Sequence, residues 1–150
     1  FWSDACQCVM KFKIFLPEYE IKKQRGQKFP VLYFLAGLTC DTTNVPQKSG
    51  FARFALKHRV AVVFPDTSPR GIENFDGLTG DYEIGNSAGF YIDAKNPKWA
   101  KHFNMYTHVS QEIPAIVNNY FPVDSQRQSI TGFSMGGFGA LLLHMKNPGQ

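Results

Sequence analysis

The sequence predicts an α/β fold in which a mainly parallel sheet is flanked by helices. Two nearly continuous apolar runs, at 29–36 and 60–64, are typical of strands in a parallel sheet. Segments with apolar residues at helical spacing lie between successive strands, the last of which is expected at 128–133. Strands that alternate with helices favour this fold class, and a length of 150 residues predicts a single domain.

An early strand is expected at 8–16, where apolar residues alternate with a partly polar set. Pro17 ends it, because proline has no N–H to donate to a sheet. The polar stretch 18–28 then forms an exposed connection. The run at 29–36 is apolar at nearly every position, so we expect both faces of that strand to be buried.

Between the two apolar strands we expect a loop and a helix. Residues 39–49 are polar and indicate the loop, whereas 50–59 carry apolar residues at helical spacing. The second buried strand follows at 60–64. The stretch 66–104 is rich in Gly, Asn, Asp and Pro and is long for a loop, but its aromatic residues predict an ordered, packed excursion.

The last third predicts two helices and a strand. One face of a helix over 105–120 collects Val109, Ile113, Ile116, Val117 and Tyr120. Pro114 should kink this helix or mark a restart. A short strand at 128–133 precedes a helix that begins at Gly136 and stops at Asn147-Pro148-Gly149.

Composition and charge exclude several classes of protein. Hydrophobic residues make up 43% and charged residues 19%, which is ordinary for globular proteins and excludes a disordered chain. No apolar run approaches the roughly 20 residues of a membrane-spanning helix, so we expect no membrane partner. The net charge of +4 comes from scattered Lys and Arg with no run longer than Lys22-Lys23, which is evidence against a nucleic-acid partner.

The cysteines point to a reducing compartment. Cys6, Cys8 and Cys40 are odd in number and irregular in spacing, unlike a disulfide framework. Cys6-x-Cys8 makes a poor zinc motif because no second pair follows it. We therefore expect reduced thiols, no metal, no cofactor and a cytoplasmic location. The N-terminus shows no signal peptide and no initiating Met, so the true start is expected to be missing.

The strongest chemical signal is Gly132-Phe133-Ser134-Met135-Gly136, between a strand and a compact helix. It matches G-x-S-x-G, the nucleophile elbow of α/β-hydrolases. The chain must reverse sharply there, so Ser134 is expected in a strained conformation with its hydroxyl at the apex. Gly132 and Gly136 have no Cβ and let the strand and the helix pack closely. Ser134 is the expected nucleophile; the alternative is a glycine-rich turn with an incidental serine.

Two backbone N–H groups are expected to form an oxyanion hole. The N–H of Met135 lies at a helix N-terminus, where the helix dipole favours negative charge. The second donor should come from the loop after an earlier buried strand, and the N–H of Leu38, in Gly37-Leu38-Thr39-Cys40, is our candidate. The alternative is that Gly37 only ends the strand.

Other polar residues are interpreted as structural. Asp66 follows a buried strand, where α/β folds place ligand loops, but an Asx-type turn with Arg70 as a salt-bridge partner is favoured. We interpret the four histidines, His58, His102, His108 and His144, as structural too. A triad in this fold runs in the order Ser, acid, His, and the 16 residues after Ser134 contain no Asp or Glu. We therefore expect an incomplete domain, truncated after the elbow helix, and we expect residues 1–150 alone to be inactive.

The chain resembles the S-formylglutathione hydrolase (esterase D) family along nearly its whole length. The resemblance is carried by MKFKIFLP (10–17), GLTC (37–40), PDTSPRG (65–71), SAGFYIDA (87–94), MY (105–106), FPVD (121–124), GFSMGG (132–137) and KNPG (146–149). It implies an α/β-hydrolase fold and a cytosolic serine thioesterase that hydrolyses S-formylglutathione to glutathione and formate in formaldehyde detoxification. It also implies cleavage of simple carboxyl esters. By this resemblance Ser134 is the nucleophile, Leu38 and Met135 are the oxyanion donors, and Cys40 is a thiol near the site that does not act as nucleophile.

The sequence departs from the family in two segments. No Trp lies between Arg70 and Gly89, where members carry one, and Phe133 and Phe138 stand where several members carry His. Two alternatives stay open: a related esterase or acyltransferase of the same fold, and a non-catalytic truncated product. A sheet without its later strands would expose an edge, so aggregation or a homodimer through that edge would favour the second alternative.

Overall fold

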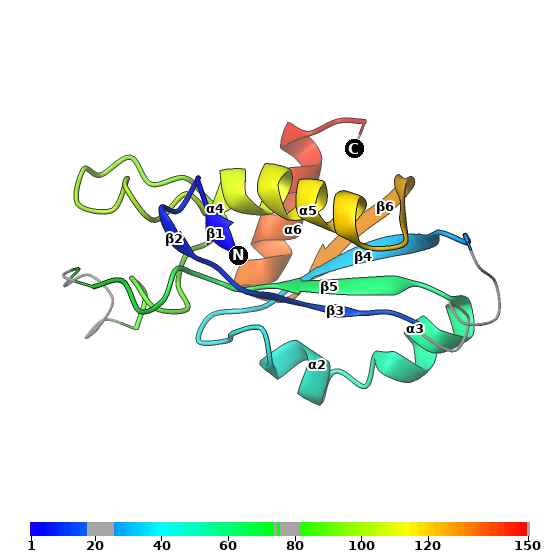
Figure 1. Ribbon diagram of the computed structural model, residues 1–150. Coiled ribbons are helices and arrows are strands. Elements are labelled where there is room, and N and C mark those ends of the chain that lie inside the picture. Colours follow the sequence, from blue (N-terminus) through cyan, green and yellow to red (C-terminus); the bar gives the residue numbers. More distant parts are fainter. Residues whose placement is uncertain (18–25, 74, 76–81, 150) are drawn as a thin grey trace.

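A computed structural model describes residues 1–17, 26–73, 75 and 82–149. Helices cover both faces of a four-stranded sheet, and a small hairpin lies near the N-terminus (Figure 1). The elements are β1 (Trp2–Ser3), β2 (Cys8–Val9), β3 (Phe12–Phe15), β4 (Phe29–Leu35), α2 (Asn44–Lys48), α3 (Ala52–His58), β5 (Ala61–Pro65), α4 (Met105–Thr107), the π-helix η2 (His108–Glu112), α5 (Ile113–Tyr120), β6 (Val123–Gly132) and α6 (Met135–Lys146).

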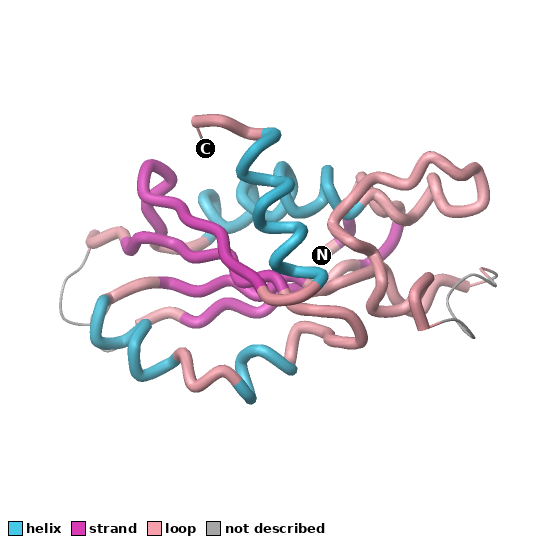
Figure 2. The backbone as a smooth tube through the Cα atoms, turned by 180° about the vertical axis from the view of Figure 1, so that it is seen from behind, coloured by secondary structure: helices cyan, strands magenta, loops and turns pink. Residues whose placement is uncertain are grey.

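The strand order of the sheet is β3-β5-β4-β6. β4 runs parallel to both β5 and β6, and β3 is antiparallel to β5. The predicted mainly parallel sheet flanked by helices is confirmed. Because β4, β5 and β6 are parallel, the loops that follow them meet at one end of the sheet, where α6 begins (Figure 2).

One face of β4 is fully buried. Phe29, Val31 and Tyr33 of β4 pack with Ile113 and Val117 of α5 in a single apolar cluster. β5 contributes alternate residues to this cluster and to another on the opposite face, so all five of its residues are buried. Burial of these apolar side chains is the main favourable contribution to folding.

The prediction that β4 is buried on both faces is wrong for one face. Leu32 and Phe34 are only partly buried against the cluster that contains Ala55 and Phe64. That face is covered by the short helices α2 and α3, which lie below the sheet in Figure 1. Its side chains are therefore shielded less completely than those under α5.

Three element boundaries differ from the expectation. The single strand predicted at 8–16 is two strands, because β2 pairs with β1 whereas β3 pairs with β5. The polar loop predicted at 39–49 contains the five-residue helix α2. The last strand begins at Val123 rather than at residue 128, because Val123 already pairs with Phe29 of β4; the register then shifts, and pairing resumes at Gln128. Most of the predicted connection at 18–28 lies outside the described residues.

The helix predicted at 105–120 is interrupted. Pro114 stands in the first turn of α5, directly after the π-helix η2, so the predicted restart is confirmed. Proline has no N–H to continue the preceding ladder, which accounts for a break there. Val109 is buried as predicted, but Tyr120 is exposed and does not belong to the buried face.

The described part of the excursion at 66–104 is packed, as predicted. Edge-to-face contacts join Phe75, Trp99 and Phe103, and Tyr91 is completely buried. In the described ranges of the chain, no helix is long and apolar enough to cross a membrane. The same residues bring together no three His, Cys, Asp or Glu side chains that could hold a metal ion.

Candidate active site

Ser134 occupies the turn between the end of β6 and the start of α6. Its backbone has φ 54° and ψ −124°, a conformation outside the helical and extended regions. The residue is exposed. Such a conformation costs about 1–3 kcal/mol and persists only where its surroundings hold it. The strained, exposed turn predicted for this serine is confirmed, and its role as nucleophile stays a prediction.

Two glycines allow the close packing of this turn. A Cβ placed on Gly132 would lie 2.3 Å from the carbonyl oxygen of Gly136. A Cβ placed on Gly136 would lie 2.1 Å from the carbonyl oxygen of Leu35, at the end of β4. Both contacts are with backbone atoms, which have no rotamer to escape into. The elbow can therefore lie this close to β4 only with glycine at both positions.

The two expected oxyanion donors lie on adjacent loops. A Cβ on Gly37 would meet the Phe133 ring at 2.8 Å, so the loop after β4 touches the elbow. The N–H groups of Leu38 and Met135 donate no hydrogen bond within the described part of the chain. For Met135 this follows from its place in the first turn of α6, where no preceding carbonyl is available. Their role as oxyanion donors stays a prediction.

The loop after β4 forms a tight turn around Leu38. The Cys40 N–H donates to the Gly37 carbonyl at 3.3 Å, and the Thr39 N–H donates to the Ser87 carbonyl at 3.2 Å. Thr39 has φ 67°, an unusual value for a β-branched residue. In a trans peptide the C=O and N–H point in opposite directions. Since the Gly37 carbonyl faces into the turn, the Leu38 N–H points out of it.

Cys40 contributes its main chain, rather than its thiol, to these contacts. Its carbonyl accepts hydrogen bonds from the Thr67 hydroxyl and, at 3.0 Å, from the Arg70 guanidinium. The thiol is free and half-buried. The next residue, Asp41, accepts from the hydroxyl and the N–H of Thr43, and the first of these bonds is the main cause that lowers its pKa.

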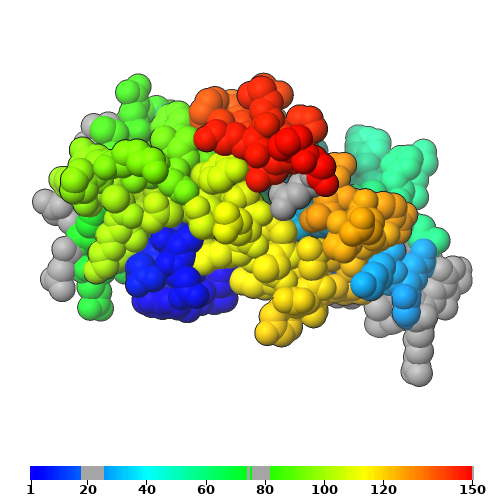
Figure 3. Space-filling model, turned by 90° about the horizontal axis from the view of Figure 1, so that it is seen from above, coloured from blue at the N-terminus to red at the C-terminus, as the bar shows by residue number. Residues whose placement is uncertain are grey.

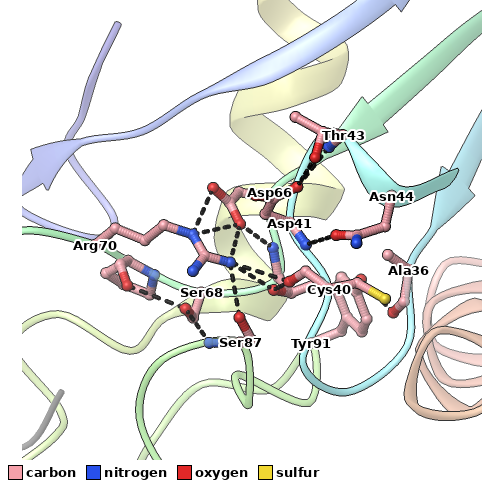
Figure 4. Close-up of polar contacts among 12 residues, drawn as sticks. Ala36, Cys40, Asp41, Thr43, Asn44, Asp66, Ser68, Arg70, Ser87 and Tyr91 are labelled. Atoms are coloured by element: carbon pink, nitrogen blue, oxygen red, sulfur yellow. Dashed lines mark hydrogen bonds and ion pairs between the residues drawn. The ribbon is translucent and has the colours of Figure 1, made fainter. Parts of the chain in front are cut away.

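Arg70 lies where three loops meet (Figure 4). Its Nε donates to both carboxylate oxygens of Asp66 at 2.9 and 3.0 Å, so the salt bridge favoured by the sequence is confirmed. Its Nη2 also reaches the Cys40 carbonyl and, at 2.9 Å, the Ser87 hydroxyl. The contacts to Cys40 and Ser87 were not predicted from the sequence. These residues lie 30 and 17 positions from Arg70, and no local pattern indicates that they meet.

A buried histidine cluster attaches the N-terminus to the helical layer. The Nδ1 of His108 lies 2.6 Å from the Glu112 carboxylate and 3.2 Å from the Ser3 hydroxyl. Burial lowers the pKa of His108 more than Glu112 raises it. Burial alone would raise the pKa of Glu112, but hydrogen bonds from Ser3, the Ala5 N–H and His108 outweigh it and lower that pKa.

None of the four histidines is placed to act as a base for Ser134. His108 is held by the cluster just described, and His102 bonds through Nδ1 to the Cys6 carbonyl at 2.8 Å. His144 lies ten residues along α6, about 15 Å from the elbow at 1.5 Å per residue. His58 ends α3, on the other face of the sheet from α6 (Figure 1).

A cavity of about 300 Å³ lies between α5, α6 and the sheet. Tyr33, Ser110, Gln128 and His144 are among its lining residues. Figure 3 shows α5, β6 and the end of α6 side by side in this region. The cavity lies toward the C-terminal half of α6, whereas Ser134 precedes the first turn of that helix. It is therefore separate from the elbow.

Comparison with known proteins assigns the chain to a family. Residues 3–150 match the family described as "Putative esterase". The chain belongs to this esterase family. The S-formylglutathione hydrolases of Bos taurus and Mus musculus are 47% and 44% identical to it over 148 residues, which are 99% of this chain and 51% of each relative. The esterase chain thus spans about half the length of the curated relatives it matches.

Solved structures give the same placement. An S-formylglutathione hydrolase from Agrobacterium tumefaciens matches the esterase chain with a TM-score of 0.91 and 38% identity, over 99% of this chain and 52% of that one. A ferulic acid esterase matches with a TM-score of 0.71 and 21% identity, over 99% of this chain and 52% of that one; this second likeness concerns the fold alone. The predicted α/β-hydrolase fold is confirmed.

Proposed function

We propose that this esterase chain carries the nucleophile and the oxyanion donors of a serine thioesterase that hydrolyses S-formylglutathione to glutathione and formate. The observation that carries the proposal is the exposed, strained Ser134 beside two unused backbone N–H groups, those of Leu38 and Met135. The 47% identity to a bovine S-formylglutathione hydrolase supports the choice of substrate.

The proposed reaction proceeds through an acyl-enzyme. The Ser134 hydroxyl loses its proton to a base, and its oxygen attacks the formyl carbon. The carbonyl oxygen becomes an oxyanion, and the N–H groups of Leu38 and Met135 donate hydrogen bonds to it. The carbon–sulfur bond then breaks, and the glutathione thiolate leaves. Water finally hydrolyses the formyl ester on Ser134, which releases formate and restores the hydroxyl.

The leaving group reduces the demand for proton transfer. A thiol has a pKa of about 8.5, so its thiolate leaves with less assistance than an alkoxide does. The attack still needs a base, because a neutral serine hydroxyl is a weak nucleophile. We place this base and its acid partner outside these 150 residues. The matched region covers only 51% of the bovine relative, so about half of that protein has no counterpart in this chain and could supply the two residues.

The proposal extends to the compartment and to partners. Cys6, Cys8 and Cys40 are all free thiols, which fits a reducing cytoplasm. The substrate is a small molecule. A homodimer stays a prediction, and size-exclusion chromatography with light scattering of the complete gene product that contains this chain is the measurement that tests it.

The test of function uses that complete gene product. We expect loss of the thioester absorbance of S-formylglutathione and a formyl adduct on Ser134 by mass spectrometry. Ser134→Ala should lower turnover by several orders of magnitude. Ser125→Ala is the matched control, since Ser125 is an exposed serine on β6, the strand that leads into the elbow. Turnover above about a tenth of wild type in folded Ser134→Ala would contradict the proposal.

Acyl specificity separates the alternatives. Rapid acylation by small acyl esters and none by feruloyl esters is the expected pattern. Preference for the bulky ester would instead indicate a feruloyl-type esterase of the same fold. A folded, complete gene product that acylates with neither would indicate a non-catalytic protein.

A further inference from the structure

The Arg70 guanidinium connects the supports of the turn that presents the Leu38 N–H. Cys40 is the last residue of this turn, and its carbonyl accepts from Arg70 Nη2 at 3.0 Å. Ser87 supports the middle of the turn, because its carbonyl accepts the Thr39 N–H. The Ser87 hydroxyl accepts from the same Nη2 at 2.9 Å. Nη2 has two hydrogens; since one points at Asp66, the other is shared between these two acceptors, so one nitrogen holds both supports (Figure 4).

A buried carboxylate fixes the direction of this guanidinium. The Asp66 side chain is 6% exposed and accepts from Nε and from Nη2 of Arg70. Asp66 also accepts the Thr67 N–H at 2.7 Å, which ties the carboxylate to the loop after β5. Because Asp66 engages one edge of the planar guanidinium, the orientation of Nη2 toward the turn is determined.

The turn needs such support because its backbone is strained. Thr39 and Ser87 both have positive φ, at 67° and 63°. A non-glycine residue in this region tends to relax toward negative φ when its contacts are removed. Relaxation at Thr39 would rotate the peptide groups on either side of it and break the bond from the Cys40 N–H to the Gly37 carbonyl. That carbonyl belongs to the same peptide group as the Leu38 N–H, so the direction of this N–H would no longer be fixed. Loss of one oxyanion donor lowers kcat by a factor of about 10²–10³.

We propose that Arg70 is a positioning residue for the oxyanion turn: held by Asp66, it fixes Cys40 and Ser87 so that the Leu38 N–H is aimed at the oxyanion. The proposal rests on the proposed function, since it assigns a role within that site. The hydrogen bonds of Arg70 go to Asp66, Thr67, Cys40 and Ser87, so the role assigned to it is exerted through the turn. Arg70 should therefore stabilise the transition state without contributing to substrate binding, so its loss should lower kcat and leave KM nearly unchanged.

The test is Arg70→Lys in the complete gene product that contains this chain. Lysine keeps the positive charge beside Asp66 but lacks the planar fork that reaches Asp66, Cys40 and Ser87 together. We expect kcat for S-formylglutathione to fall about tenfold to a hundredfold, with KM within about threefold. Affinity for a small alkyl boronic acid, whose adduct with serine places an oxygen at the oxyanion position, should fall by the same factor. Affinity for glutathione should be unchanged.

Two further variants keep the result interpretable. Arg127→Lys is the matched control, because Arg127 pairs with Asp124 in an exposed ion pair on β6, and it should leave all these values unchanged. If Arg70→Lys fails to fold, Ser87→Ala replaces it. That variant removes one acceptor of Nη2 and keeps the main-chain bond to Thr39, and it should lower kcat and boronate affinity about threefold to tenfold.

The outcomes separate this inference from the proposed function. Folded Arg70→Lys with kcat and boronate affinity within twofold of wild type overturns the positioning role, and so does an equal loss of glutathione affinity. A wild-type protein that acylates Ser134 with 4-nitrophenyl acetate but ignores S-formylglutathione overturns only the proposed substrate, and the variants are then compared on the ester. A wild-type protein that neither acylates nor binds the boronate overturns both.

Discussion

A methyl group at Gly136 is expected to push the nucleophile elbow away from β4. In Gly136→Ala the new Cβ would lie 2.1 Å from the Leu35 carbonyl oxygen, whereas real Cβ contacts are essentially never shorter than 3.0 Å. The start of α6 must therefore retreat by at least the difference, 0.9 Å. The new Cβ has no rotamers and its partner is a main-chain oxygen, so no side-chain rotation relieves the contact.

This displacement moves the groups that the proposed reaction uses. Ser134 and the Met135 N–H lie at the same end of α6 as Gly136. A misplacement of about 1 Å costs on the order of 10²-fold in rate. Overpacking of this kind also destabilises a fold by about 1–3 kcal/mol. We expect kcat/KM for S-formylglutathione to fall about a hundredfold, together with a lower thermal midpoint.

The neighbouring glycine provides the control. A Cβ on Gly137 would lie 3.5 Å from the nearest atom, the Gly132 carbonyl oxygen, which is an ordinary contact. Gly137→Ala should keep kcat/KM within about threefold and leave stability unchanged or up to about 1 kcal/mol higher. Both variants are assayed in the complete gene product, with the thermal transition recorded for each. Equal activity of folded Gly136→Ala and wild type would refute the reasoning, since it would mean that the elbow tolerates this shift.

Other predictions concern the thiol near the site and the buried histidine cluster. Alkylation of Cys40 should slow the enzyme. Cys40→Ala should keep at least about a tenth of the activity and should no longer be slowed by the alkylating reagent, because the hydrogen bonds of this residue are made by its main chain. An inactive but folded Cys40→Ala would assign the thiol a chemical role. Folding lowers the pKa of His108, so its contribution to stability is complete above the unfolded pKa of 6.5 and is lost as pH falls below that value. Folding also lowers the pKa of Glu112, whose contribution to stability is lost in the same way as pH falls below 4.5. The thermal midpoint should therefore fall as pH is lowered from 7.5 to 5.5. It should fall less steeply in His108→Gln than in wild type or in His58→Gln, the control at an exposed histidine. Equal dependence of the midpoint on pH in all three proteins would contradict this role of His108.

The parts that the sequence predicted well are those with a local pattern. The elbow could be found because G-x-S-x-G, the preceding strand and the following helix are contiguous, and its backbone strain follows from that turn. β5 could be found because all five of its residues are buried, so its apolar run is unbroken. The restart at Pro114 follows from the missing N–H of proline.

The parts that the sequence missed depend on contacts between distant segments. α2 has only five residues and no side-chain N-cap bond, so nothing in its sequence separates it from a loop. β6 begins at Val123 because that residue pairs with Phe29 of β4, well before the continuous pairing that starts at Gln128. The bond from Ser3 to Glu112 spans 109 positions. The contacts of Arg70 with Cys40 and Ser87 cross between loops that meet only because parallel strands end together.

Strained backbone is concentrated around the elbow. Among the described residues, positive φ outside glycine occurs at Gln7, Thr39, Arg59, Ser87, Phe90, Tyr91 and Ser134. Arg59 follows the last turn of α3, where this conformation is common, and Gln7 lies in the N-terminal hairpin. The other five lie in the elbow and in the loops held against it. Each costs about 1–3 kcal/mol, which the surrounding contacts must offset. When a support such as Arg70 is weakened, Thr39 and Ser87 can relax, which releases part of their strain energy but moves the turn. We therefore expect such a variant to lose much of its activity while its free energy of unfolding changes little.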